Sequence, residues 1–317
     1  MADATGKVIF AGLAANLLVA ASKYAAAAFT GSSSMLSEAV HSTADCLNQV
    51  LLVYGMRRAR KRPSADHPLG HGREIYFWSF IVALLIFALG AGVSIYEGVL
   101  HILHPHPIES FAASYWVLGA AMLFEGSSWL VAHKEFRHRK GSRGYLQAAE
   151  ETKDPRTLMM FSEDSAALLG LSIALAGTAA AQATGSPLWD AMASIAIGLL
   201  LAVVALFLAR ENKKLLIGES ARPKLMQAVE EATREERAVE ELNGLLSFQL
   251  SPDEVVIVLS VHFTPTMRST EVEEAIERLE ARIRGEHPEV VMLVVKPQTR
   301  AAYERVVRQR LAGKPLP

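Results

Sequence analysis

Long runs of apolar residues, separated by short polar connections, fill the chain from about residue 8 to residue 209. A helix needs about 20 mostly apolar residues to cross the hydrocarbon core of a bilayer. Six segments have this length and composition, and six such segments exceed what the core of one globular domain holds. They predict an α-helical membrane protein with six transmembrane helices, at 8–30, 35–54, 75–100, 112–131, 158–181 and 189–209.

The pattern changes after the sixth segment, where charged residues become frequent. Two stretches show the spacing of amphipathic helices. Three shorter ones have the apolar character of strands, and the last two are also rich in valine. Their order predicts a ferredoxin-like αββαβ domain with both helices on one face of a sheet. The helices are expected at 223–243 and 270–286, and the strands at 245–250, 255–263 and 290–296. We therefore divide the chain into a transmembrane domain at 1–212 and a C-terminal cytoplasmic α+β domain at 213–317.

Lysine and arginine are distributed unevenly between the connections. Three connections, at 31–34, 101–111 and 182–188, carry neither residue, whereas the other two are rich in both. The positive-inside rule therefore predicts that both termini are cytoplasmic. The basic residues are Arg57, Arg58, Arg60, Lys61 and Arg62 in one connection, and Lys134, Arg137, Arg139, Lys140 and Arg143 in the other.

The first apolar segment lacks a small-residue cleavage site, so we interpret it as a span and not as a signal peptide. With no targeting presequence recognised, we expect the bacterial inner membrane. The chain is 51% hydrophobic, has a net charge of −1 and contains one cysteine. We therefore expect a lipid bilayer around it, no nucleic-acid partner and no intrachain disulfide.

Two ionisable residues, His41 and Asp45, lie inside the second apolar segment. Residues four apart share one face of a helix, so both side chains point the same way. Ionisable residues within a span are functional candidates by default. An imidazole nitrogen and a carboxylate oxygen also form half of a tetrahedral site for a divalent metal. The alternative for the histidine is a hydrogen bond between two membrane helices.

Glu163 and Asp164 enter the fifth apolar segment as neighbours. Adjacent helical residues are about 100° apart, so the two carboxylates cannot share one face. Both could instead be acids at a helix N-terminus, favoured by the helix dipole. If Asp164 faces His41 and Asp45, the three form a mixed nitrogen and oxygen site, which Glu163, Ser162 or water could complete. Glu125, deep in the fourth segment, has no explanation from the sequence.

The connection after the second segment contains Asp66, His67 and His71 near two glycines that permit tight turns. These three side chains could hold a cation at the cytoplasmic mouth. The same residues also suit a turn that caps the third helix.

Several motifs together resemble the cation diffusion facilitator family of zinc-transporter-like metal exporters. The HPLGHGR run at 67–73 looks like that family's HPxGHGR loop, and SIYEG at 94–98 and Asp190 are similar too. The resemblance implies that His41, Asp45 and Asp164 are ligands of a transport site. The second-segment pattern of the family is met by Ser32, Ser34, Met35, Leu36, Ser37, Ala39, Val40, His41 and Asp45, whereas Glu38 departs from it.

The chain departs from the family pattern at two other places. Met160 stands where members commonly carry His or Asp, so Glu163 is expected to substitute, as in a subgroup that reads Glu-Asp here and includes mitochondrial zinc transporters. Ser64 replaces the usual loop aspartate, so Asp66 has to stand in for it. The C-terminal domain resembles the family's cytoplasmic dimerisation domain, which implies a homodimer. Its last strand lacks the His-x-Asp pair of some members, so little or no metal is expected in that domain.

The resemblance implies a divalent metal efflux transporter, not an enzyme, that exchanges metal for protons by alternating access. Zinc is the first choice of ion, and manganese, iron, cobalt and cadmium suit the same ligands. No cofactor is expected, and His41 is the expected proton switch. The rivals are a membrane metal sensor or scaffold acting through its cytoplasmic domain, and an intramembrane metalloenzyme. The latter needs a motif such as His-Glu-x-x-His, which the sequence lacks.

Overall fold

The computed structural model describes residues 2–106, 108, 110–141 and 144–311. The chain forms two compact units, Met1–Arg62 with Glu74–Lys213, and Pro63–Arg73 with Lys214–Pro317. We call them the helical unit and the sheet unit. Arg143, one of the basic residues used for orientation, and residues 312–317 of the predicted cytoplasmic domain lie outside the described residues.

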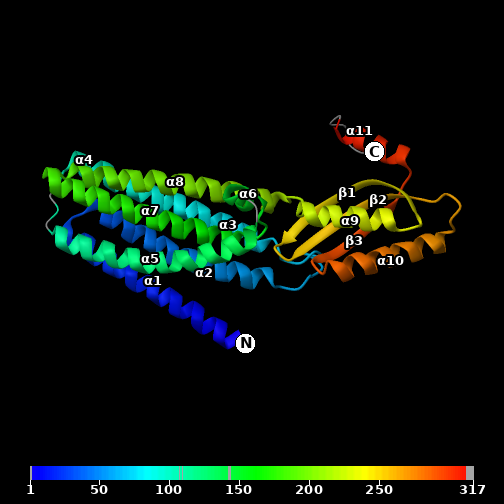
Figure 1. The fold of residues 1–317 in the computed structure, drawn as a ribbon, viewed down its shortest axis with the longest axis horizontal. Helices are drawn as coiled ribbons and strands as arrows, with labels where there is room; N and C mark the ends of the chain where they lie inside the picture. Colours follow the sequence, from blue (N-terminus) through cyan, green and yellow to red (C-terminus); the bar gives the residue numbers. More distant parts are fainter. Residues whose placement is uncertain (1, 107, 109, 142–143, 312–317) are drawn as a thin grey trace. The chain divides into compact units, whose positions relative to one another are not determined.

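Long helices cover all six predicted apolar segments (Figure 1). The third segment is not a uniform α-helix, because a π-helical stretch, η1, joins α3 to α4. A short helix, α6, lies before α7 and was not predicted. The bounds are α1 Ala2–Thr30, α2 Ser33–Ala59, α3 Glu74–Leu85, η1 Ile86–Ala91, α4 Gly92–Leu103, α5 Phe111–Lys140, α6 Tyr145–Glu151, α7 Pro155–Thr184 and α8 Leu188–Ile217.

Three helical stretches among the described residues are long and apolar enough to cross a membrane. They are Glu74–Leu103, Pro155–Thr184 and Leu188–Ile217, with mean hydropathies of 2.3, 1.6 and 2.7. The helical membrane architecture is thereby supported, whereas the count of six spans stays a prediction. Helix α2 differs from these three because its interior carries Glu38, His41, Asp45 and Asn48.

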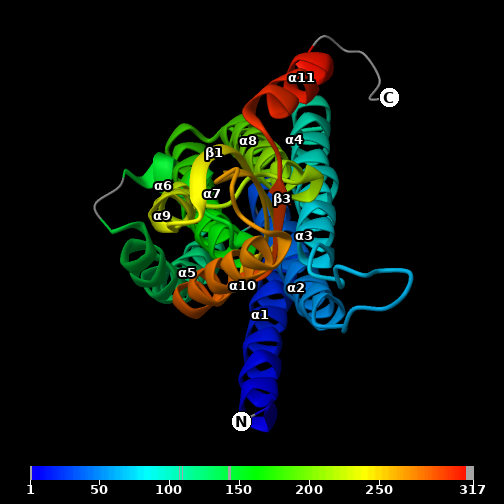
Figure 2. The ribbon, with the colours of Figure 1, turned by 90° about the vertical axis from the view of Figure 1, so that its right-hand side faces the viewer.

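Helix α2 contacts α1, α3, α4 and α7, and α5 lies beside α7 (Figure 2). Glycines allow α8 to approach its neighbours closely. A Cβ on Gly98 of α4 would lie 2.5 Å from Ile195 Cγ1, and one on Gly198 of α8 would lie 2.6 Å from Ile95 Cγ1. Small residues let membrane helices pack at short range, so these contacts join α4 and α8 tightly.

The sheet unit contains a three-stranded sheet in the order β1-β2-β3. Strands β1 and β2 are antiparallel, and β2 and β3 are parallel. Helices α9 and α10 share one hydrophobic core with the sheet, which includes Val229, Ile257 and Leu279. The bounds are α9 Pro223–Glu235, β1 Val239–Ser251, β2 Glu254–Phe263, α10 Ser269–Glu286, β3 Val290–Pro297 and α11 Arg300–Leu311.

The helix predicted at 223–243 is wrong at its C-terminal end. Helix α9 ends at Glu235, and β1 begins at Val239. Val239 pairs with Phe263 and Leu242 with Val261, so pairing with β2 outweighs the local helical pattern. The observed order of helices and strands is otherwise αββαβ as predicted, followed by α11, which was not predicted.

Candidate metal centre in the helical unit

His41 and Asp45 lie one turn apart on α2, with His41 Nδ1 3.7 Å from Asp45 Oδ1. The His41 side chain is almost fully buried, and neither ring nitrogen has a hydrogen-bond partner among the described residues. Asp45 Oδ1 also lacks one. Buried polar atoms are normally paired, so three unpaired atoms on one helix face are an exception that needs an explanation.

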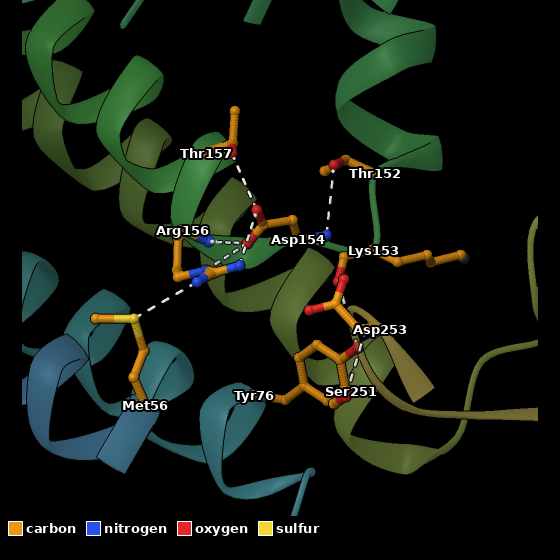
Figure 3. A network of polar contacts seen from close by, with 9 residues as sticks. All are labelled: Met56, Tyr76, Thr152, Lys153, Asp154, Arg156, Thr157, Ser251 and Asp253. Atoms are coloured by element: carbon orange, nitrogen blue, oxygen red, sulfur yellow. Dashed lines mark hydrogen bonds and ion pairs between the residues drawn. The ribbon is translucent and has the colours of Figure 1, made fainter. Parts of the chain in front are cut away.

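A network at the start of α7 anchors the helix that carries the acidic pair (Figure 3). Asp154 is the N-cap residue, and its carboxylate accepts hydrogen bonds from Arg156 N at 3.1 Å and Thr157 Oγ1 at 3.1 Å. The hydroxyl of Tyr76 on α3 donates to Lys153 O at 3.3 Å. Proline at the first helical position fits this cap because its missing N–H would be unpaired there.

Glu163 and Asp164 point to different helices, as their angular separation requires. Asn48 Nδ2 on α2 donates to Glu163 Oε1 at 2.9 Å. Ser128 Oγ on α5 donates to Asp164 Oδ2 at 3.0 Å. Glu163 is therefore tied to the helix of His41 and Asp45, and Asp164 to α5. Asn48 lies seven residues after His41, so helical periodicity alone could have placed it on the same face.

Among the described residues, no three His, Cys, Asp or Glu side chains gather closely enough to hold a metal ion. The assignment of His41, Asp45, Glu163 and Asp164 as one ligand set therefore stays a prediction. The structure brings the first two together and connects α2 to Glu163 through Asn48.

A buried ion pair lies close to this helix face and was missed by the sequence reasoning. Lys23 Nζ on α1 lies 3.1 Å from Glu38 Oε2 and donates to Ser42 Oγ at 2.8 Å. Both charged side chains are fully buried. The second oxygen, Glu38 Oε1, has no described donor and points at α7, where a Cβ on Gly170 would collide with it. The pair thus connects α1, α2 and α7.

Asp190 has a role that its place near the start of α8 does not reveal. Its carboxylate accepts hydrogen bonds from Ser33 N at 2.7 Å, Ser34 N at 3.3 Å and Ser32 Oγ at 2.8 Å, and from the Ser33 and Ser34 hydroxyls. It therefore caps the N-terminus of α2, where the helix dipole favours negative charge. A run of three serines before an apolar helix is the sequence signal for such a cap.

The loop histidines form a pair in the sheet unit. The rings of His67 and His71 have centroids 4.4 Å apart and are tilted by 32°. The turn between them is closed by Gly70 N donating to His67 O at 2.9 Å, and Gly70 has a φ of 77°. Asp66 is exposed beside them. Metal binding by Asp66, His67 and His71 stays a prediction.

A profile of the cation efflux transmembrane domain matches residues 9–217, which include all four predicted transport ligands. The chain belongs to the cation diffusion facilitator family. Mitochondrial proton-coupled zinc antiporters of Xenopus laevis and Homo sapiens are 36% and 35% identical to it over 260 residues, which cover 81% of this chain and 46% of each relative. A metal tolerance protein of Arabidopsis thaliana is 34% identical over 257 residues, covering 80% of this chain and 56% of that protein.

The chain spans about half the length of the curated relatives that it matches. The predicted family is confirmed, and its members are integral membrane transporters, not enzymes. The four predicted ligands lie on α2 and α7, both within the matched domain. Met160, which stands where family members commonly carry His or Asp, is half exposed. Glu163, the residue expected to substitute for it, is hydrogen-bonded to α2 through Asn48.

Proposed function

We propose that this protein exports a divalent metal cation, with zinc as the first choice, in exchange for protons. The observation that carries the proposal is the His41–Asp45 pair, buried on α2 with unpaired nitrogen and oxygen atoms. Imidazole and carboxylate suit zinc, and the names of the mitochondrial relatives point to zinc and proton coupling. Manganese, iron and cobalt are the alternatives within the same ligand chemistry.

The ligands account for the exchange of metal and protons. A metal binds neutral imidazole and ionised carboxylate, so loading the site from the cytoplasm releases protons. In the outward-open state, protons compete for His41, Asp45, Glu163 and Asp164 and displace the metal. The hydrogen bond from Asn48 holds Glu163 toward α2, whereas the bond from Ser128 holds Asp164 toward α5.

Six spans and cytoplasmic termini complete the proposal. Helices over all six apolar segments support the count, and the absence of Lys and Arg from three alternate connections supports the orientation. The proposed host is the bacterial inner membrane.

A homodimer is proposed through the face of the sheet opposite α9 and α10. Leu246, Phe248, Met292 and Val294 are 40–49% exposed in this chain. The register places them around Val256 and Val258, since Phe248 pairs with Val256, which pairs with Met292. Contiguous exposed apolar residues mark protein interaction sites, and a second copy of the chain would bury them.

The test is metal-driven proton flux in proteoliposomes with an imposed pH gradient, comparing zinc, manganese, iron(II) and cobalt. Asp45→Asn is expected to abolish flux, whereas Glu273→Gln, on the exposed surface of α10, is expected to leave it unchanged. Proton flux with manganese and not with zinc would identify manganese as the substrate. Metal binding without flux for any ion would reject the antiporter and favour a sensor.

A further inference from the structure

A groove of about 760 Å³ lies between α5 and α7 of the helical unit, about one turn from the hydrogen bond of Ser128 and Asp164. Its lining changes character along α5. Val131 and Ala132 come first, with Met160 on the opposite wall, and Val131 and Met160 are 68% and 51% exposed. One to two turns further, the lining consists of Lys134, Arg137 and His138, all exposed.

The basic end of the groove is available to a ligand. Among the described residues, neither Lys134 nor Arg137 forms a hydrogen bond or an ion pair. Glu135, the carboxylate in the lining, has an interaction of its own. The hydroxyl of Thr157 donates its hydrogen bond to Asp154, so Thr157 lines the groove without offering a donor to a ligand. Two fixed positive charges against one carboxylate leave this end net positive.

We propose that the groove binds one anionic phospholipid, with the headgroup phosphate at Lys134 and Arg137 and an acyl chain along Val131 and Met160. The apolar end belongs to a predicted span, and the basic end lies where that span leaves the hydrocarbon. Basic pockets between membrane helices bind anionic headgroups in this way. A peptide does not suit the groove equally well, because its backbone would lie unpaired against the apolar walls.

The lipid would bridge the two helices that carry Ser128 and Asp164. Both ends of its binding site are formed by α5 and α7 together, since Met160 and Thr157 come from α7 and the remaining lining from α5. Occupancy therefore opposes separation of these helices. The proposal rests on the membrane placement of the helical unit and not on which ion is transported.

The test is native mass spectrometry of the full chain after exchange from vesicles of phosphatidylcholine with phosphatidylglycerol. Wild type is expected to retain one phosphatidylglycerol in preference to phosphatidylcholine. The Lys134→Gln/Arg137→Gln variant removes two charges worth about 1 kcal/mol each, which corresponds to roughly 30-fold weaker retention. The matched control, Lys61→Gln/Arg62→Gln, removes two exposed charges from the other basic connection and is expected to retain the lipid.

Equal loss in both double variants would overturn the proposal, because it would show a general charge effect. Equal retention of both lipids by wild type would do the same. Excess glycerophosphate that displaces the lipid completely would reject the acyl-chain half of the groove, and with it the phospholipid. Thermal unfolding of each variant checks that the fold is intact. We expect unchanged unfolding temperatures, because all four substituted side chains are exposed.

Discussion

The side-chain amide of Asn48 donates a hydrogen bond of 2.9 Å to Glu163 Oε1 and joins α2 to α7. Asn48 comes three residues after Asp45 and seven after His41, so the bond lies on the helix face that carries the proposed ligands. It selects Glu163, and not its neighbour Asp164, as the acid that α2 holds.

Replacing Asn48 tests this bond directly. Asn48→Leu leaves a partly buried Glu163 oxygen without its donor, at a cost of about 1 kcal/mol in the free energy of unfolding. We expect weaker zinc binding as well, because Glu163 is no longer oriented toward α2. Isothermal titration with zinc measures the affinity. Ser128→Ala removes the donor to Asp164, and equal effects of the two variants on affinity would contradict a special role for Glu163.

The Lys23–Glu38 pair predicts a large and asymmetric effect on stability. Lys23→Met leaves the buried Glu38 carboxylate without its counter-charge, which costs about 3–5 kcal/mol when a buried pair is broken. The double variant Lys23→Met/Glu38→Met removes both charges and is expected to recover most of that loss. Unfolding in detergent measures all four members of the cycle. Additive losses in the double variant would show that the two side chains do not interact.

Asp190 is expected to control the first turn of α2. Asp190→Asn keeps the shape but removes the charge and one acceptor oxygen, so donors from Ser32, Ser33 and Ser34 lose a partner. A loss of about 2 kcal/mol is expected, as for hydrogen bonds to a charged group. Hydrogen exchange at the Ser33 and Ser34 amides should become faster. Asp253→Asn, on an exposed turn, is the control, and unchanged exchange in both variants would contradict the cap.

The local stability of helix α11 is predicted to depend on pH in the acid range. Arg300 and then Arg308 donate hydrogen bonds to Glu304 and lower the pKa of its carboxyl below the usual 4.5. Because the folded pKa is depressed, this stabilisation is present above the unfolded pKa and is lost as pH falls through the folded value. The protection factors of the α11 amides, which are corrected for the intrinsic exchange rate at each pH, should therefore fall as the pH drops below 4.5. Glu304→Gln should remove that pH dependence, and its persistence would assign it elsewhere.

The open sheet face predicts the oligomeric state. Phe248→Asp places a charge among exposed apolar side chains and is expected to weaken self-association of the full chain at least tenfold. The loss of one buried aromatic side chain, about 1.5–3 kcal/mol, accounts for that factor. Analytical ultracentrifugation in detergent measures it. Glu273→Lys on α10 is the matched control, and an unchanged Phe248→Asp dimer would move the interface to another surface.

Hydrophobic periodicity was sufficient to place the six long helices and the order of elements in the sheet unit. It failed at 239–243, where strand pairing decides the conformation, and at η1, whose π-helical geometry depends on tertiary packing. The spacing of His41 and Asp45 predicted their shared face. It could not show which of Glu163 and Asp164 faces α2, nor that Lys23 reaches Glu38, because both depend on contacts between separate helices.

The π-helical stretch Ile86–Ala91 determines which way the side chains of α4 face around the helix axis. A residue added to one turn rotates the downstream face by about 100° relative to a continuous α-helix. With that rotation, Gly98 is aimed at Ile195, and Ser94 O accepts a hydrogen bond from Ser194 Oγ at 2.7 Å. Ser194 Oγ in turn lies 2.6 Å from Ser37 Oγ on α2. Conversion of η1 to an ordinary α-helix would therefore rotate α4 about its axis relative to α3. That rotation would break the contacts of Gly98 and Ser94 with α8.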